Sequence, residues 1–364
     1  MTVPRVKNDQ HTCREPETQW KFADILADAA INERWQKVRR YFFLRESTYD
    51  MTRRCNIHCE GCYYFEGPKQ YAEENSDPDA WRQFMQDEKA RGVTFVVLAG
   101  AEPGLVPELC RVCYEEMPLG TIATNGLVRI PDTVGYKIHI SVWGNDATSR
   151  RIRGAAHMLE RQIENYRNDP RAVFVYTFTP ANIEEAREVA EILAAQDAKL
   201  TFNMFSAPVG YDGPLKHSPD SLKKTRATML KLLADDPAHV LFSNYNAVVH
   251  THQLGLHDLF ACPYPRRNAA RNVGLGRSFR QYRTDLSWDR KAACCVPDTD
   301  CGDCRHYAAG SAIVTAKLFR HAIDPVTFSA WLDYVDTYLA VWVKGYEKGV
   351  NLYSGVTEPP CCPS

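Results

Sequence analysis

Short apolar runs alternate with segments of helical periodicity through the middle of the chain. Helices are predicted at Pro78–Arg91, Leu105–Met117, Ser149–Asn168 and Ile183–Gln196. The apolar runs are predicted as six strands: Ser47–Met51, Val93–Leu98, Gly120–Thr124, Lys137–Val142, Val173–Phe178 and Leu200–Phe205. This alternation is typical of an α/β fold with a parallel sheet, in which the carboxyl ends of the strands surround a common site.

Helical patterns also flank this region. Glu15–Tyr41 includes an amphipathic helix, and Ala308–Gly349 is predicted to be mainly helical, with an interruption near Pro325. We therefore expect four parts: an N-terminal helical extension (1–45), the α/β domain (46–235), a cysteine-rich module (236–310) and C-terminal helices with a tail (311–364).

The overall composition excludes some partners. The 364 residues are 45% hydrophobic and 24% charged, with a formal net charge of −1. A chain without excess positive charge is not expected to bind nucleic acid through its overall field. No apolar run is long enough to cross a bilayer, and Met1–Lys21 lacks the apolar region of a signal peptide. We expect no membrane partner and a cytoplasmic location.

The thirteen cysteines are grouped, and the first group contains Cys55, Cys59 and Cys62 with the spacing Cys-x3-Cys-x2-Cys. Three thiolates on one loop can bind three irons of a cubane iron–sulfur cluster and leave the fourth iron without a protein ligand. Zinc is the alternative, although structural zinc sites usually combine two cysteine pairs. A disulfide is not expected in a reducing cytosol.

This loop resembles the signature of the radical S-adenosylmethionine (radical SAM) superfamily. The resemblance implies an open, TIM-like partial (β/α)6 barrel and a [4Fe–4S] cluster on Cys55, Cys59 and Cys62. It also implies that the open iron chelates SAM and that a flavodoxin- or ferredoxin-type protein donates an electron. The resulting 5′-deoxyadenosyl radical would abstract hydrogen from an unactivated C–H bond.

Motifs at the strand ends extend the resemblance. Ala99-Gly100-Ala101-Glu102-Pro103 resembles the Gly-Gly-Glu-Pro turn of the superfamily, which implies that Glu102 accepts hydrogen bonds from the SAM ammonium and that Gly100 and Ala101 allow close approach. The resemblance assigns Asn125, Ser141 and Arg153 to the same SAM pocket. Strand alternation independently places Ser141 with His139 and Trp143 on one face, and Arg153 could equally be a solvated helix residue.

One position departs from the family pattern. Members often carry an aromatic residue just before the third cysteine, where it packs on adenine, whereas this chain has Gly61. Tyr63 or Phe65 could supply the ring, or either could be a core aromatic. Asn203 on the sixth predicted strand is a further candidate for contact with adenine or substrate.

A second group of cysteines resembles the auxiliary-cluster extensions called SPASM and twitch. Four thiolates could ligate a second [4Fe–4S] cluster, with zinc as the alternative; the candidate ligands are Cys262, Cys294, Cys295, Cys301 and Cys304. No cysteine follows Gly274 or Gly276 at the required spacing, so a full two-cluster SPASM domain is not expected. Cys110 and Cys113 lie on one face of a predicted helix and are read as buried structural thiols.

The sequence therefore predicts a radical SAM enzyme that acts on a small-molecule, natural-product substrate. The alternative substrate is a peptide, as in the maturation of ribosomally made natural products. A protein of another class, a non-catalytic iron–sulfur or electron-transfer protein on a degenerate radical SAM fold, is also considered. The intact cysteine trio and Glu102 argue against it, because a degenerate member would lose such residues first.

Overall fold

The computed structural model describes residues 19–62, 65, 74–260, 281–282 and 299–353. Its centre is a parallel seven-stranded sheet in the order β6-β5-β4-β3-β2-β1-β7. The strands are β1 (Glu46–Asp50), β2 (Phe95–Ala99), β3 (Gly120–Thr124), β4 (Lys137–Val142), β5 (Ala172–Phe178), β6 (Leu200–Met204) and β7 (Gln281–Tyr282). The six predicted strands are confirmed within two residues at each end. β7 was not predicted; it pairs with Thr48 and Tyr49 of β1.

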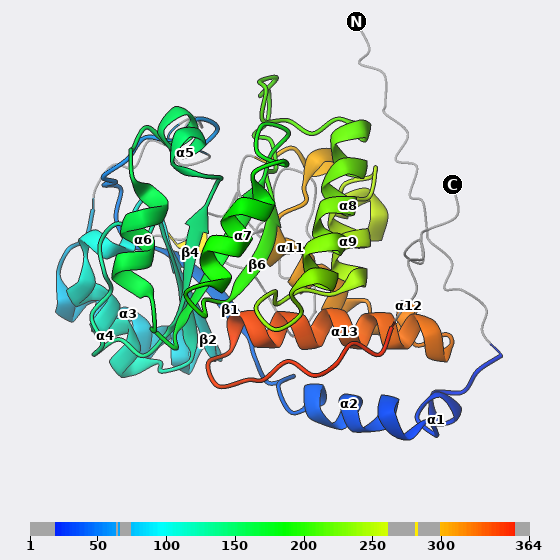
Figure 1. Ribbon diagram of the computed structural model, residues 1–364. Helices are drawn as coiled ribbons and strands as arrows, with labels where there is room; N and C mark the ends of the chain where they lie inside the picture. Colours follow the sequence, from blue (N-terminus) through cyan, green and yellow to red (C-terminus); the bar gives the residue numbers. More distant parts are fainter. Residues whose placement is uncertain (1–18, 63–64, 66–73, 261–280, 283–298, 354–364) are drawn as a thin grey trace, which may run out of the picture.

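Helices that follow the strands cover one face of the sheet (Figure 1). They are α3 (Pro78–Ala90), α4 (Pro107–Glu116), α5 (Asp146–Arg153), α6 (Met158–Tyr166), α7 (Ala186–Ala194) and α8 (Pro219–Asp235). The single helix predicted at Ser149–Asn168 is wrong, because Gly154 adopts a left-handed conformation (φ 71°) that ends α5. The outward residues Ile138, Ile140 and Val142 of β4 belong to the core on this face.

The other face is partly covered by helices from both ends of the chain. They are α1 (Phe22–Ile25), α2 (Ala29–Arg39), α9 (Asn244–His250), α10 (Leu256–Phe260), α11 (Tyr307–Ala316), α12 (Leu318–His321) and α13 (Pro325–Trp342). The predicted interruption near Pro325 is confirmed, since α13 begins there with Asp324 as its N-cap. These helices share a core with the β2 residues Phe95 and Val97.

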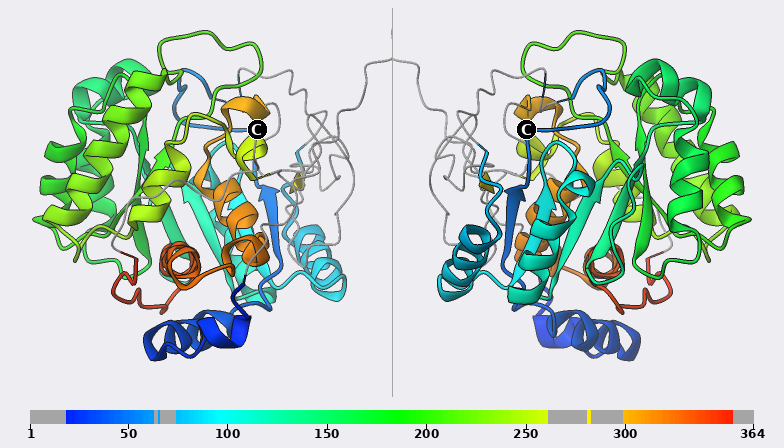
Figure 2. Two further views of the ribbon diagram at one scale, coloured as in Figure 1. Left: turned by 90° about the vertical axis from the view of Figure 1, so that its right-hand side faces the viewer. Right: turned by 90° about the vertical axis from the view of Figure 1, so that its left-hand side faces the viewer.

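The C-terminal end of α13 is anchored to the sheet. The Thr121 hydroxyl donates to the carbonyl of Trp342 at 3.1 Å, and an imidazole nitrogen of His139 lies 2.8 Å from the carbonyl of Val341. Figures 1 and 2 show α13 running along the lower end of the sheet, with α2 beneath it. The lower end of the partial barrel is thus covered, while the carboxyl ends of the strands surround the site described below.

No helix among the described residues is both long enough and apolar enough to cross a membrane. The division of the chain at residues 45, 235 and 310 stays a prediction.

Candidate active site

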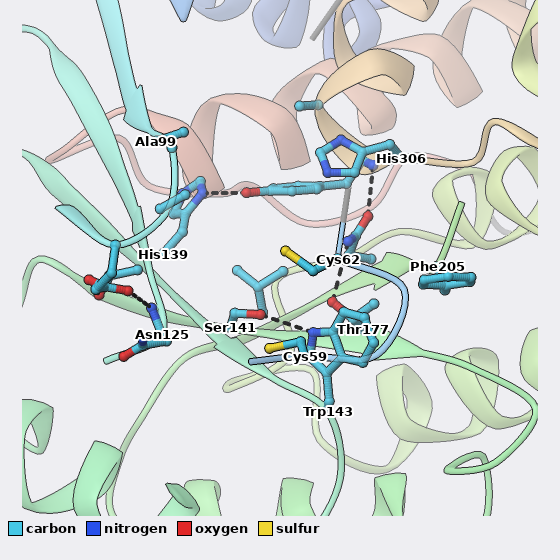
Figure 3. A pocket seen from close by; sticks show the side chains of 18 of the residues that line it. Cys59, Cys62, Ala99, Asn125, His139, Ser141, Trp143, Thr177, Phe205 and His306 are labelled. Carbon is cyan, nitrogen blue, oxygen red and sulfur yellow. Dashed lines mark hydrogen bonds between the residues drawn. The ribbon is translucent and has the colours of Figure 1, made fainter. Parts of the chain in front are cut away.

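A cavity of about 270 Å³ receives residues from all six predicted strands and from the cysteine loop (Figure 3). Among its lining residues are all the described candidates for the cluster and SAM: Cys55, Cys59, Cys62, Gly100, Ala101, Glu102, Asn125, Ser141 and Arg153. The two ring candidates differ, because Phe65 lines the cavity and Tyr63 lies outside the described residues. The sequence separations between these residues are large, so the sheet is what brings them together.

Backbone hydrogen bonds fix the cysteine loop to two neighbouring elements. The N–H of Glu102, beyond β2, donates to the carbonyl of Arg54 at 3.0 Å, and the N–H of Glu60 donates to the carbonyl of Ile152 in α5 at 2.8 Å. Within the loop, the N–H of Cys62 donates to the carbonyl of Cys59 at 3.3 Å. The loop that carries the three thiols is therefore held beside the cavity by hydrogen bonds to the end of β2 and to α5.

Two side chains donate hydrogen bonds to sulfur. Nε of Arg153 lies 3.5 Å from Sγ of Cys59, and Nδ2 of Asn125 lies 3.8 Å from Sγ of Cys55. Arg153 also donates to the carbonyl of Ser141 and is only 5% exposed. The reading of Arg153 as a solvated helix residue is therefore wrong. A buried positive charge and an amide donor beside the thiols suit an anionic metal–thiolate centre.

The spacing of the thiols favours a cluster over a single zinc ion. The ligands of tetrahedral zinc–thiolate sites lie about 3.8 Å apart, given Zn–S bonds of about 2.3 Å. In the part of the chain that the structure describes, one group of three ligand atoms lies within 4.8 Å of one another, and it is Asp146, His157 and Glu160 on the surface. The sulfurs of Cys55, Cys59 and Cys62 are not all within 4.8 Å of one another, which fits ligands of separate irons.

Burial raises the pKa of the Cys55 thiol, and the charge of Arg153 opposes that shift. Binding to iron would offset this cost, because a metal stabilises the thiolate directly.

Glu102 is held on the cavity wall between β2 and β3. It is 1% exposed and accepts hydrogen bonds from the N–H of Gly104 (2.7 Å), the hydroxyl of Thr124 (2.6 Å) and the N–H of Asn125 (2.7 Å). Burial raises the pKa of this carboxyl, and these hydrogen bonds and Arg153 oppose the shift. The carboxylate therefore has a fixed orientation before any ligand binds.

Gly100 makes this arrangement possible. Its φ is +78°, and a Cβ at this position would lie 2.6 Å from Cα of Asp50 in β1. A glycine lets the end of β2 lie against β1 in a left-handed conformation, which places Glu102 beside the cysteine loop.

The predicted alternation along β4 is confirmed. His139, Ser141 and Trp143 all line the cavity, and Nε1 of Trp143 donates to Oγ of Ser141 at 3.0 Å. Ser141 is thus oriented by a neighbouring ring rather than by solvent.

The ring that packs on Gly61 was missed by sequence reasoning. Gly61 has a φ of +67°, and a Cβ there would lie 2.8 Å from two ring carbons of Phe205, which directly follows β6. Phe205 lines the cavity and contacts Trp143 edge to face, with ring centroids 5.8 Å apart. An aromatic ring therefore lies at the place where the family pattern has one, but it comes from the other end of the barrel.

A second wall of the cavity was predicted only at Asn203. It combines Thr177 of β5 and Asn203 of β6 with His306, Tyr307 and Trp342. The candidate Asn203 accepts from the N–H of Tyr307 at 2.9 Å and donates to Oγ1 of Thr177 at 3.3 Å. The sequence signal was the position of His306 and Tyr307 directly after Cys304, but only the fold shows that they reach the barrel.

His139 is neutral and has a defined tautomer. Its Nε2 lies 2.8 Å from the carbonyl of Val341 and must donate, so its Nδ1 accepts from the hydroxyl of Tyr307, also at 2.8 Å. Burial lowers the pKa of His139 to about 3, which is consistent with an uncharged ring. The pair fixes the ring of Tyr307 against Trp342, with the two rings stacked at 5.2 Å.

The C-terminal cysteine region abuts the same site. Cys301 and Cys304 are half-buried, and the carbonyl of Cys304 accepts from the N–H of Leu256 at 2.8 Å. The N–H of Arg305 donates to Oγ of the cavity residue Ser206 at 2.9 Å. Three other candidate ligands, Cys262, Cys294 and Cys295, lie outside the described residues. A second metal site therefore stays a prediction.

Cys110 and Cys113 are fully buried in α4, and burial raises the pKa of both thiols. The prediction that both thiols are buried is confirmed.

Parts of the chain are similar to known proteins. No family model matches the chain. The sporulation killing factor maturation protein SkfB of Bacillus subtilis is 28% identical over 158 residues, which are 40% of this chain and 38% of SkfB. The chain thus matches well under two thirds of the length of this relative.

Two solved structures are also similar. Streptococcus suis SuiB bound to S-adenosylmethionine has a TM-score of 0.50 and 14% identity, over 72% of this chain and 64% of SuiB. The structure of anSMEcpe with bound AdoMet and Cp18Cys peptide has a TM-score of 0.47 and 15% identity, over 78% of this chain and 83% of that protein. The chain thus shares its partial-barrel fold with SuiB, and its cysteine loop and strand-end motifs line one cavity.

Proposed function

We propose that the protein is a radical SAM enzyme that modifies a peptide. The observation that carries the proposal is the single cavity in which three thiols, the oriented carboxylate of Glu102 and the Ser141 face of β4 come together. A [4Fe–4S] cluster on Cys55, Cys59 and Cys62 would supply the electron for reductive cleavage of SAM to a 5′-deoxyadenosyl radical that abstracts a substrate hydrogen. A flavodoxin- or ferredoxin-type donor would reduce the protein.

The residues of the chain bind and orient in this scheme. Glu102 accepts hydrogen bonds from the SAM ammonium, and its three existing donors hold the carboxylate in place. Arg153 and Asn125 stabilise thiolate charge through their donors to sulfur. Phe205 offers a ring face above Gly61 for adenine. The covered lower end of the barrel excludes water from the reacting C–H bond.

A peptide is preferred to the small molecule predicted from the sequence. Support comes from SkfB, whose name assigns it to the maturation of a killing factor. The cytoplasmic location stays a prediction.

Anaerobic reconstitution with iron, sulfide, SAM and dithionite tests whether the protein cleaves SAM. We expect 5′-deoxyadenosine from the wild type and none from the triple variant Cys55→Ala/Cys59→Ala/Cys62→Ala. The double variant Cys110→Ala/Cys113→Ala removes thiols from α4, outside the cavity, and is the matched control that retains cleavage. If the reconstituted wild type yields no 5′-deoxyadenosine, the non-catalytic iron–sulfur alternative replaces this proposal.

Iron and sulfide content of the triple variant tests the auxiliary site separately. If about four irons per chain remain in the triple variant, the C-terminal cysteines bind a second [4Fe–4S] cluster. Zinc in place of that iron refutes the cluster.

A further inference from the structure

Trp143 directly follows β4 and lines the cavity beside Ser141 (Figure 3). Its backbone carbonyl accepts from Nδ2 of Asn182 at 3.1 Å, which fixes the chain where it leaves the strand. Its ring lies edge to face against Phe205, with centroids 5.8 Å apart, and the guanidinium of Arg153 lies over it, 5.8 Å from the ring centroid. The indole is therefore held both by its backbone and by its ring contacts.

Ser141 is fixed through its backbone as well. Its carbonyl accepts from the guanidinium of Arg153, and from Nε2 of Gln162 at 2.9 Å. Every other residue of β4 is buried, whereas Ser141 is half-buried and lines the cavity. Because its carbonyl is covered by these two side chains and its side chain consists of Cβ and Oγ alone, the exposed surface of Ser141 is that of its hydroxymethyl group.

The hydrogen bond between the two side chains has a fixed direction. An indole N–H can only donate, so the oxygen of Ser141 accepts from Nε1 of Trp143 at 3.0 Å. The proton of the hydroxyl must therefore point away from the indole, and no acceptor for it is found among the described residues. An O–H group that accepts on one side and borders a cavity on the other presents its proton to a ligand.

Two other tryptophans show what a structural indole does in this chain. Trp81 donates to the carbonyl of Asn75 at 2.8 Å, and Trp331 donates to the carbonyl of Val314 at 2.9 Å. A backbone carbonyl has no rotatable proton, so these bonds orient no further donor. The bond of Trp143 differs, because it selects one of about three staggered positions of the Ser141 oxygen.

A neutral O–H donor suits an oxygen acceptor of the ligand. In the proposed function, Glu102 beyond β2 takes the ammonium of SAM and Phe205 after β6 offers a ring for adenine. Ser141 lies on β4, which is between β2 and β6 in the sheet. The part of SAM between its ammonium and its adenine carries oxygen acceptors on the carboxylate and on the ribose.

We propose that Trp143 is a positioning residue for SAM, whose indole N–H holds the hydroxyl of Ser141 in the orientation that donates to an oxygen of SAM. Trp143 acts through Ser141 and does so without a hydrogen bond of its own to the ligand. The inference rests on the proposed function, because it assigns the group that orients a donor in the SAM pocket.

The test measures the dissociation constant of SAM by anaerobic titration calorimetry on the reconstituted protein, without a reductant, so that SAM is not cleaved. Ser141→Ala should weaken binding about tenfold, the equivalent of one hydrogen bond. Trp143→Phe keeps a ring but removes the N–H, and it should weaken binding about threefold because the serine oxygen regains about three staggered positions. In a Ser141→Ala background, Trp143→Phe should cause no further loss.

A second replacement separates the N–H from the ring. β-(3-Benzothienyl)alanine at position 143 has a sulfur in place of the indole N–H and keeps the shape of the ring, so binding should weaken by the same factor of about three. Iron content should match the wild type in both variants. Trp81→Phe is the matched control, because it removes an indole donor of α3 outside the cavity lining and should leave SAM affinity unchanged.

Decarboxylated SAM identifies the acceptor. A threefold loss in Trp143→Phe that persists with this ligand assigns the acceptor to the ribose, and a loss seen only with SAM assigns it to the carboxylate.

The proposal is overturned if the benzothienyl variant binds SAM as tightly as the wild type, because the ring and not its N–H would then matter. It is also overturned if Trp143→Phe weakens binding equally in the Ser141→Ala background. If the wild type does not bind SAM, this proposal and the proposed function both fail. If the wild type binds SAM but forms no 5′-deoxyadenosine with dithionite, only the proposed function fails.

Discussion

Replacing Gly100 with alanine tests how the end of β2 is held against β1. The new Cβ would lie 2.6 Å from Cα, 2.7 Å from Cβ and 2.8 Å from Oδ1 of Asp50, whereas carbon atoms normally approach to about 3.5–4.0 Å. Two of these atoms belong to a buried strand and cannot rotate away. The strands must therefore separate by roughly 1 Å at this point.

The expected cost has two parts. A left-handed φ costs an alanine about 1–2 kcal/mol relative to glycine. Overlap with packed atoms adds about 1–3 kcal/mol. The free energy of unfolding of Gly100→Ala should therefore fall by about 2–5 kcal/mol.

Gly210 is the matched control, because its φ is +83° and an added Cβ would have no atom within 4 Å. Gly210→Ala should lose only the conformational part, about 1–2 kcal/mol. Both variants are compared with the wild type by anaerobic urea unfolding followed by circular dichroism. SAM cleavage should also fall in Gly100→Ala, because Glu102 follows two residues later. Equal losses of stability in the two variants would refute the steric argument.

Three further predictions concern the contact of Phe205 with Gly61, the charge of Arg153 and the buried ring of His321. Gly61→Ala should lower the free energy of unfolding by about 2–4 kcal/mol in the wild type, but by only about 1 kcal/mol in a Phe205→Ala background. If the effects of the two substitutions are additive in the double-mutant cycle, the two residues are not in contact. The Arg153→Met variant should keep its iron, but its reduction potential in an EPR-monitored titration should fall by about 60 mV. This shift is the equivalent of about 1.4 kcal/mol of lost charge stabilisation near Cys59. An unchanged potential would show that the Arg153 guanidinium does not act on the iron–sulfur cluster. Burial lowers the pKa of His321 from 6.5 to about 4, so the unfolded state takes up a proton at a higher pH than the folded state does. The free energy of unfolding should therefore fall by about 1.4 kcal/mol per pH unit as the pH drops from 6.5 to about 4. In His321→Gln the pH dependence measured by urea unfolding should be one proton shallower, and an unchanged slope would argue against a neutral buried ring.

Local patterns predicted most of the sheet and one wall of the cavity. Strand periodicity located six strands and placed Ser141 on the inner face of β4, because side chains alternate along a strand whatever surrounds it. The boundary of α5 was missed because the left-handed conformation of Gly154 is compatible with many contexts, and a glycine within a helical pattern does not by itself mark an end.

The contacts of Arg153 could not be predicted. The sequence left open whether Arg153 belongs to the SAM pocket or is a solvated helix residue, whereas the fold buries it between Cys59 and the carbonyl of Ser141. A long side chain chooses among the partners that tertiary packing brings within reach, and sequence spacing does not give that choice.

The sequence by itself determined where the six strands lie along the chain, the loop with three thiols, and the turn that carries Glu102, because each depends on residues close together in the chain. Tertiary structure alone decided what completes the cavity: Phe205 against Gly61, and the wall of His306 and Tyr307. Tyr307 bonds His139 across 168 positions of sequence. Such contacts depend on how the C-terminal helices pack into the open barrel, and that packing is fixed by burial of apolar surface rather than by any local motif.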